Sequence, residues 1–175
     1  MKIDRTAFNK LLSMLTGVDR QVLDRIGGSL RKAGMVSVGG RGINSPHITP
    51  EDVKNILLGL MGTDNASRAA EAVKILTELK SDTGKKAGDA IVQLLTDPSY
   101  RKDLSAIHVT RNYPEVVIYW GLEENPESQR EEIFTADGNL LQFQTKAILD
   151  GRVVILIVSQ NQWINDQLDQ IRAGQ

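Results

Sequence analysis

Residues 19–46 decide the fold that the sequence predicts, and they read DRQVLDRIGGSLRKAGMVSVGGRGINSP. Apolar side chains recur at helical spacing in the first half of this segment, which predicts a helix over residues 19–33 with one buried face. These side chains are Val22, Leu23, Ile26, Leu30 and Ala33. The other face carries long polar side chains that can donate hydrogen bonds to phosphates or base edges, namely Arg20, Gln21, Arg25, Arg31 and Lys32.

The ends of this helix carry recognisable signals. Asp19 stands at the N-cap position, and Gly34 stands where a helix C-terminus favours a residue with positive φ. A second helix is predicted just before it, over residues 4–15, with Gly17 ending that helix. Residues 35–38 are β-type and lead into the glycine-rich basic loop Gly39–Gly42. The order predicted is therefore helix, tight turn, helix, short strand and basic loop.

Two adjacent glycines, Gly27 and Gly28, fall in the middle of the predicted helix. Each costs about 1 kcal/mol relative to alanine in a helix interior. Either the helix breaks at this pair, or the glycines allow the close approach of another helix or of a DNA backbone. The sequence leaves both interpretations open.

Charge is distributed unevenly along the 175 residues. Residues 1–46 contain eight basic and three acidic side chains, a net charge of +5, whereas the remaining residues carry a net charge of −6. A basic N-terminal unit on an acidic body is expected for a protein that binds a polyanion through one end. Chance clustering on a solvated face is the alternative.

The rest of the chain changes from helical to alternating periodicity. Residues 49–104 predict a helical block that begins at a capping signal, Thr49-Pro50, and ends at Asp97-Pro98. From residue 105 the alternation predicts strands, then a hairpin at Asp150-Gly151 and a terminal helix over 160–172. We therefore expect an α+β protein with three units: a helical head (1–48), a helical packing or oligomerisation block (49–104), and an antiparallel sheet with a terminal helix (105–175).

Composition narrows the class of protein. The chain is 41% hydrophobic and 25% charged, as is typical of globular proteins, and no apolar run approaches the roughly 20 residues that span a bilayer. The N-terminus lacks the apolar stretch of a secretory signal, and the absence of cysteine fits a reducing compartment. We expect a cytoplasmic protein.

Little in the sequence indicates catalysis. The two histidines, His47 and His108, have no second histidine or regularly spaced carboxylate with which to bind a metal. No serine-nucleophile motif occurs, and a thiol nucleophile is impossible without cysteine. The loop Gly39–Pro46 lacks the third glycine and the Lys-Ser/Thr pair of nucleotide-binding turns. We expect no enzyme activity, no cofactor and no bound metal.

The segment Leu30–Val36, followed by an arginine-bearing glycine loop, resembles the recognition helix and wing of winged helix-turn-helix proteins. This resemblance covers residues 5–46 and implies that the second helix enters the major groove of double-stranded DNA. The order of parts also loosely resembles uncharacterised phage and prophage proteins, which pair a Gly-Gly-Arg-Gly wing and a Pro-His-x-Thr-like helix start with an α/β tail. A phage-type transcriptional regulator, acting as a homodimer on two half-sites in a bacterial cell or a phage-infected host, is the function that this implies.

On this hypothesis each polar side chain has a role. Arg20, Gln21 and Arg25 face bases; Ser29, Arg31 and Lys32 meet phosphate; Arg41, supported by Asn44, acts from a wing over residues 35–46. An exposed turn with no partner is the alternative for the wing. Two other functions remain open: a DNA-packaging subunit resembling the small terminase, in a ring of about eight or more copies, and a protein-binding module that uses the acidic β half.

Overall fold

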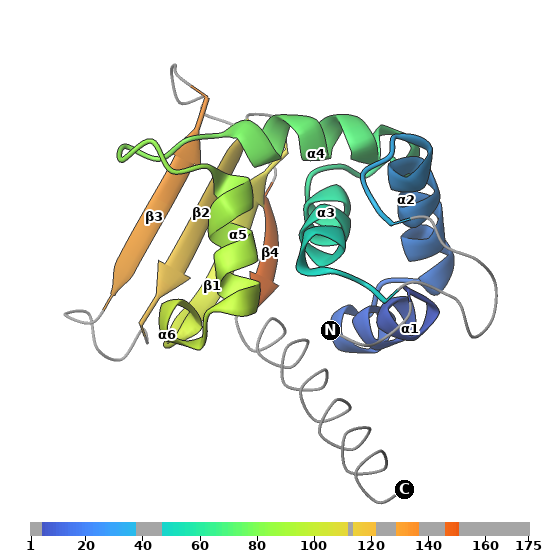
Figure 1. The fold of residues 1–175 in the computed structure, drawn as a ribbon, viewed down its shortest axis with the longest axis horizontal. Helices are drawn as coiled ribbons and strands as arrows, with labels where there is room; N and C mark the ends of the chain where they lie inside the picture. The colour runs from blue at the N-terminus through green and yellow to red at the C-terminus, as the bar shows by residue number, and fades with distance from the viewer. Residues whose placement is uncertain (1–4, 38–46, 112–113, 122–128, 137–145, 151–175) are drawn as a thin grey trace, which may run out of the picture.

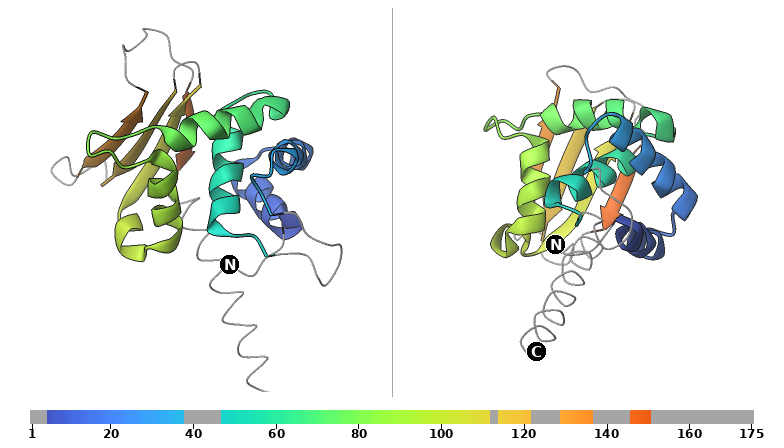
Figure 2. Two further views of the ribbon diagram at one scale, coloured as in Figure 1. Left: turned by 45° about the horizontal axis from the view of Figure 1, so that its top comes forward. Right: turned by 45° about the vertical axis from the view of Figure 1, so that its right-hand side comes forward.

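The computed structural model describes residues 5–37, 47–111, 114–121, 129–136 and 146–150. These residues form a mixed structure of helices and one antiparallel sheet, arranged in three layers (Figure 1). The sheet forms one layer, α3 and α5 lie against it, and α1 and α2 lie on the side of α3 away from the sheet (Figures 1 and 2). The expectation of an α+β fold with an antiparallel sheet is therefore confirmed.

The elements follow the order that the sequence periodicity predicts. The helices are α1 (Arg5–Thr16), α2 (Arg20–Lys32), α3 (Pro50–Met61), the 3₁₀ turn η2 (Ala66–Arg68), α4 (Ala69–Glu78), α5 (Ala87–Thr96) and α6 (Pro98–Arg101). The strands are β1 (Leu104–Thr110), β2 (Glu115–Trp120), β3 (Arg130–Thr135) and β4 (Lys146–Asp150). Asp97 ends α5 as expected, but the chain turns at once into α6, because the Asp97 carboxylate accepts hydrogen bonds from the Ser99 and Tyr100 amides.

The sheet has the order β3-β2-β1-β4, with every neighbouring pair antiparallel. Its inner face packs on the helices through Ile107 and Val109 of β1, Val116 and Ile118 of β2, and Phe134 of β3. These side chains belong to the same hydrophobic core as Phe8 of α1 and Leu23 of α2. One continuous core thus runs from the N-terminal helices to the sheet.

Helix α3 is the centre of that core. Its start is fixed by a capping box, in which the Thr49 hydroxyl accepts from the Asp52 amide and the Asp52 carboxylate accepts from the Thr49 amide. Gly59 lets α2 approach closely, since a Cβ there would lie 3.2 Å from Cγ2 of Ile26. Because α3 touches α2 on one side and the sheet layer on the other, it couples the two halves of the protein.

Two expectations about the head are resolved. Helix α2 does not break at Gly27-Gly28, and its ends are where the sequence predicted them, with Asp19 as N-cap and Gly34 at φ +70°. The predicted strand over residues 35–38 is wrong for residues 35–37, which are not in a strand. Their backbone groups bind side chains instead: the Met35 carbonyl accepts from Asn55 at 2.6 Å, and the Ser37 amide donates to Asp52 at 2.7 Å.

Several expectations fall on other parts of the chain. The wing loop with Arg41 and Asn44, the hairpin turn beyond Asp150 and the terminal helix over 160–172 lie outside the described residues.

Candidate nucleic-acid interface

The solvent-facing side of α2 is the candidate site. Four residues of the helix are buried, Leu23, Ile26, Gly27 and Leu30, and they lie on one side. The residues predicted to contact DNA occupy the other side, where Arg20, Gln21, Arg25, Arg31 and Lys32 are exposed and Ser29 is half-buried. We call this side the α2 face. The structure therefore brings six of the eight predicted side chains onto one helix surface.

Successive residues of a helix are 100° apart, so the four cations of α2 lie along two edges of the α2 face, and Gly28 lies between these edges. Arg20 and Arg31 form the edge that borders α1. On this edge Arg20 pairs with Asp24 at 3.8 Å, and Asp24 accepts a hydrogen bond from Asn9 of α1 at 2.9 Å. Part of the charge on this edge is thus neutralised within the protein.

Arg31 also lies near a second cation of α1. Burial, followed by the positive charge of Arg31, lowers the pKa of Arg5, while Asp52 acts in the opposite direction. The Arg5 side chain points toward the end of α2, where it donates to the Ser37 carbonyl at 2.5 Å. This end of the α2 face therefore holds two guanidinium groups close together, an arrangement that favours an anion.

The other edge, with Arg25 and Lys32, borders a groove. One wall and the floor come from α2, through Arg25, Gly28, Ser29 and Lys32, and the opposite wall comes from residues 64–67, which include the acidic Asp64. We call it the α2–η2 groove, and its volume is about 730 Å³. Among the described residues, no carboxylate lies within ion-pair distance of Arg25, Arg31 or Lys32. These three cations are available to a ligand.

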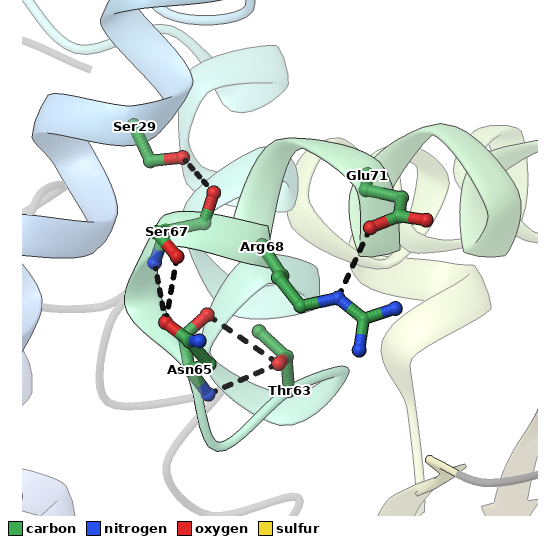
Figure 3. A network of polar contacts seen from close by, with 6 residues as sticks. All are labelled: Ser29, Thr63, Asn65, Ser67, Arg68 and Glu71. Atoms are coloured by element: carbon green, nitrogen blue, oxygen red, sulfur yellow. Dashed lines mark hydrogen bonds and ion pairs between the residues drawn. The ribbon is translucent and has the colours of Figure 1, made fainter.

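The η2 wall of the groove is held by its own hydrogen bonds (Figure 3). Asn65 Oδ1 accepts from the amide and the hydroxyl of Ser67, at 3.0 and 2.8 Å. The Ser29 hydroxyl crosses from α2 and donates to the Ser67 carbonyl at 3.2 Å. Ser29 was expected to meet phosphate, and here its hydroxyl fixes the distance between the two walls.

One carboxylate fixes the backbone at residues 37 and 49, near the two ends of the predicted wing. Asp52, only 3% exposed, accepts hydrogen bonds from the amide and hydroxyl of Ser37 and from the amide and hydroxyl of Thr49. Burial alone would raise the pKa of Asp52, but the hydrogen bonds from Thr49 and Ser37 outweigh burial and lower it. This carboxylate therefore holds residues 37 and 49 together beside the end of α2.

Sequence reasoning missed three residues of this site. Asn65, Ser67 and Asp52 are not among the predicted site residues. The Asn65 hydrogen bonds are with near neighbours in the chain, whereas the contacts of Ser67 with Ser29 and of Asp52 with Ser37 join segments that are far apart along the chain. Gly28 was noticed, although its place in the centre of the α2 face was not.

The charge of the described head agrees with this surface. Residues 5–37 contain six basic and two acidic side chains, a net charge of +4. In the part of the chain that the structure describes, no group of three or more His, Asp or Glu side chains could hold a metal ion. His47 is exposed, and the ring of His108 lies 4.6 Å from that of Tyr119 on the outer face of the sheet.

The chain matches no protein-family model, no curated protein and no solved structure. Within the described ranges, no helix is long and apolar enough to cross a membrane.

Proposed function

We propose that this protein binds double-stranded DNA through the α2 face, as a transcriptional regulator of the winged helix-turn-helix kind. The observation that carries the proposal is the grouping of Arg25, Arg31 and Lys32 on one exposed helix side, with no acidic partner for any of them among the described residues. The three-residue turn between α1 and α2 also agrees with the helix-turn-helix arrangement. DNA is the polyanion that best fits a straight helix bearing guanidinium and amide groups.

The test is a binding titration of random-sequence duplex DNA over a series of salt concentrations. Three cations neutralise about three phosphates, so the variant Arg25→Ala/Arg31→Ala/Lys32→Ala should bind weakly, and its slope of log K against log salt should fall by about 2–3. The matched control removes three exposed charges from the central block, as Lys74→Ala/Lys80→Ala/Lys102→Ala. That control should bind as the wild type does, and equal losses in the two variants would refute the assignment of the α2 face.

We expect a homodimer, which would present two copies of α2 to two half-sites of the DNA. Light scattering on the purified protein distinguishes the proposed dimer from the packaging subunit. A ring of about eight or more copies would favour DNA packaging, and a dimer would favour the regulator.

A second candidate function is protein–protein contact through the outer face of the sheet. The register places Ile133, Val117, His108 and Ile148 in one row across the outer face of the sheet. Ile133 is 44% exposed and Ile148 is 64% exposed, and they lie on the two edge strands of the sheet, while Val117 between them is buried. We propose that a second copy of the chain covers this row.

The variant Ile133→Lys/Ile148→Lys tests this assembly. It should convert the dimer to a monomer that keeps the circular dichroism spectrum of the wild type, while Met14→Lys, a change at another exposed apolar side chain, should leave the dimer intact. A wild-type protein that is monomeric at all concentrations would remove this candidate.

A further inference from the structure

Gly28 has no packing role within the described protein. A Cβ atom built on Gly28 meets no other atom within 4 Å, whereas one built on Gly59 or Gly88 contacts a neighbouring helix. Glycine weakens a helix interior relative to alanine. A residue that weakens its own element without an internal reason is expected where a partner approaches the backbone. Gly28 lies between the two edges of the α2 face, so that partner would approach the α2 face.

The groove beside Gly28 has the chemistry for one chain of phosphates. Arg25 and Lys32 stand one above the other along α2, and Gly28 and Ser29 form the floor between them. The opposite wall presents the polar groups of Asn65 and Ser67, whose positions are fixed by the hydrogen bonds described above. The Asp64 carboxylate also lines this wall, and Arg111 pairs with it. A sugar–phosphate backbone suits this arrangement, because it needs cations at intervals and a smooth surface between them.

From these observations we infer that the α2–η2 groove binds one sugar–phosphate strand of the DNA duplex, which lies against the bare helix backbone at Gly28. This inference rests on the proposed function and adds which part of the DNA enters the groove. It also divides the cations of α2: Arg25 and Lys32 contact this strand, and Arg20 and Arg31 lie outside the groove.

The closing experiment fills the groove without changing its charge. Gly28→Ala and the longer Gly28→Gln should keep the melting temperature at or above that of the wild type, because a Cβ at this position meets open space and both residues favour a helix more than glycine does. Affinity for the random-sequence duplex should fall roughly tenfold for Gly28→Ala and further for Gly28→Gln. Gly27→Ala is the matched control, since its Cβ makes an ordinary 3.7 Å contact with Arg5 and does not face the groove.

A second measurement compares the edges of α2 at equal charge. Arg25→Gln/Lys32→Gln should lower the salt slope by about 2, and Arg20→Gln/Arg31→Gln should lower it by less than about 1.

The outcomes separate the inference from the proposed function. If the Gly28 variants bind as the wild type while the triple alanine variant of the α2 face fails to bind, the groove inference is overturned and the proposed function stands. A loss of affinity in Gly27→Ala equal to that in Gly28→Ala would also overturn the inference, as would a fall in melting temperature of Gly28→Ala. If the wild-type protein binds no duplex even at low salt, both are overturned.

Discussion

Replacing Asp52, a residue of α3 that binds Ser37 of the head, should weaken the fold more than replacing any polar side chain of the head itself. Its carboxylate accepts four hydrogen bonds, at 2.7 and 2.9 Å from Ser37 and at 2.9 and 2.9 Å from Thr49. Asp52→Ala leaves both hydroxyls able to turn to water, but it also leaves two backbone amides without their acceptor. An orphaned buried donor costs about 1–3 kcal/mol. We therefore expect the free energy of unfolding to fall by about 3 kcal/mol once the lost capping interaction is included.

Urea denaturation followed by circular dichroism measures this loss. The control is Glu71→Ala, which also removes an acidic residue from a first helical turn, but whose ion pair with Arg68 is exposed to solvent. Such a pair contributes less than about 1 kcal/mol. A loss for Asp52→Ala no larger than for Glu71→Ala would refute the claim that Asp52 holds residues 37 and 49 together.

The pH dependence gives an independent signature of the same carboxylate. The pKa of Asp52 lies below its ordinary value of 3.8, so its stabilising contribution is fully present above pH 3.8 and is lost as the pH falls through the lowered pKa. The difference in stability between the wild type and Asp52→Asn should therefore be constant near neutral pH and shrink below pH 3.8. A difference that does not change with pH would show that the hydrogen bonds do not depend on the charge of Asp52.

Other predictions concern contacts outside the α2 face. Gly88→Ala places a Cβ 2.5 Å from Cγ2 of Thr77, so it should destabilise the fold by about 1–3 kcal/mol, and Thr77→Ser should restore part of the loss in the double variant. Burial, aided by the Glu132 carboxylate, raises the pKa of Tyr100. The stabilisation that depends on its protonated form is therefore present below pH 10 and is lost at higher pH. Because Tyr100 stays protonated up to about pH 11, the Tyr100→Phe variant should have the same phenolate absorbance as the wild type below that pH. Arg111→Ala removes a 2.8 Å hydrogen bond to the C-terminus of α3 and an ion pair, and it should lower the free energy of unfolding by about 1 kcal/mol in urea titrations.

The elements that local chemistry controls could be predicted from the sequence. The start of α3 follows from Thr49 and Asp52, which are three residues apart and satisfy each other, and the end of α2 follows from Gly34. Both signals depend only on neighbours in the chain, so no knowledge of the tertiary structure was needed.

Tertiary contacts decided the points that the sequence left open or predicted wrongly. Helix propensity made a break at Gly27-Gly28 possible, but Ile26 and Leu30, on either side of the pair, are buried in the core and hold the helix together. The β-type residues 35–37 form no strand because side chains of α3 and Arg5 take their backbone groups. A sequence read by local pattern carries no information about such partners.

The candidate site also shows that local sequence patterns do not reveal which side chains lie together in space. Position along α2 suggested that early residues read bases and later ones bind phosphate, since Arg20, Gln21 and Arg25 precede Arg31 and Lys32. Position around the helix groups them differently, because Arg25 and Lys32 share the groove edge while Arg20 and Arg31 share the edge toward α1. A duplex contacts the surface of a helix, so the residues that touch one DNA strand should share an edge of the α2 face and need not be neighbours in the chain. The paired variants of the two edges therefore test whether a side chain's position around α2, and not its position along the chain, decides its contact with DNA.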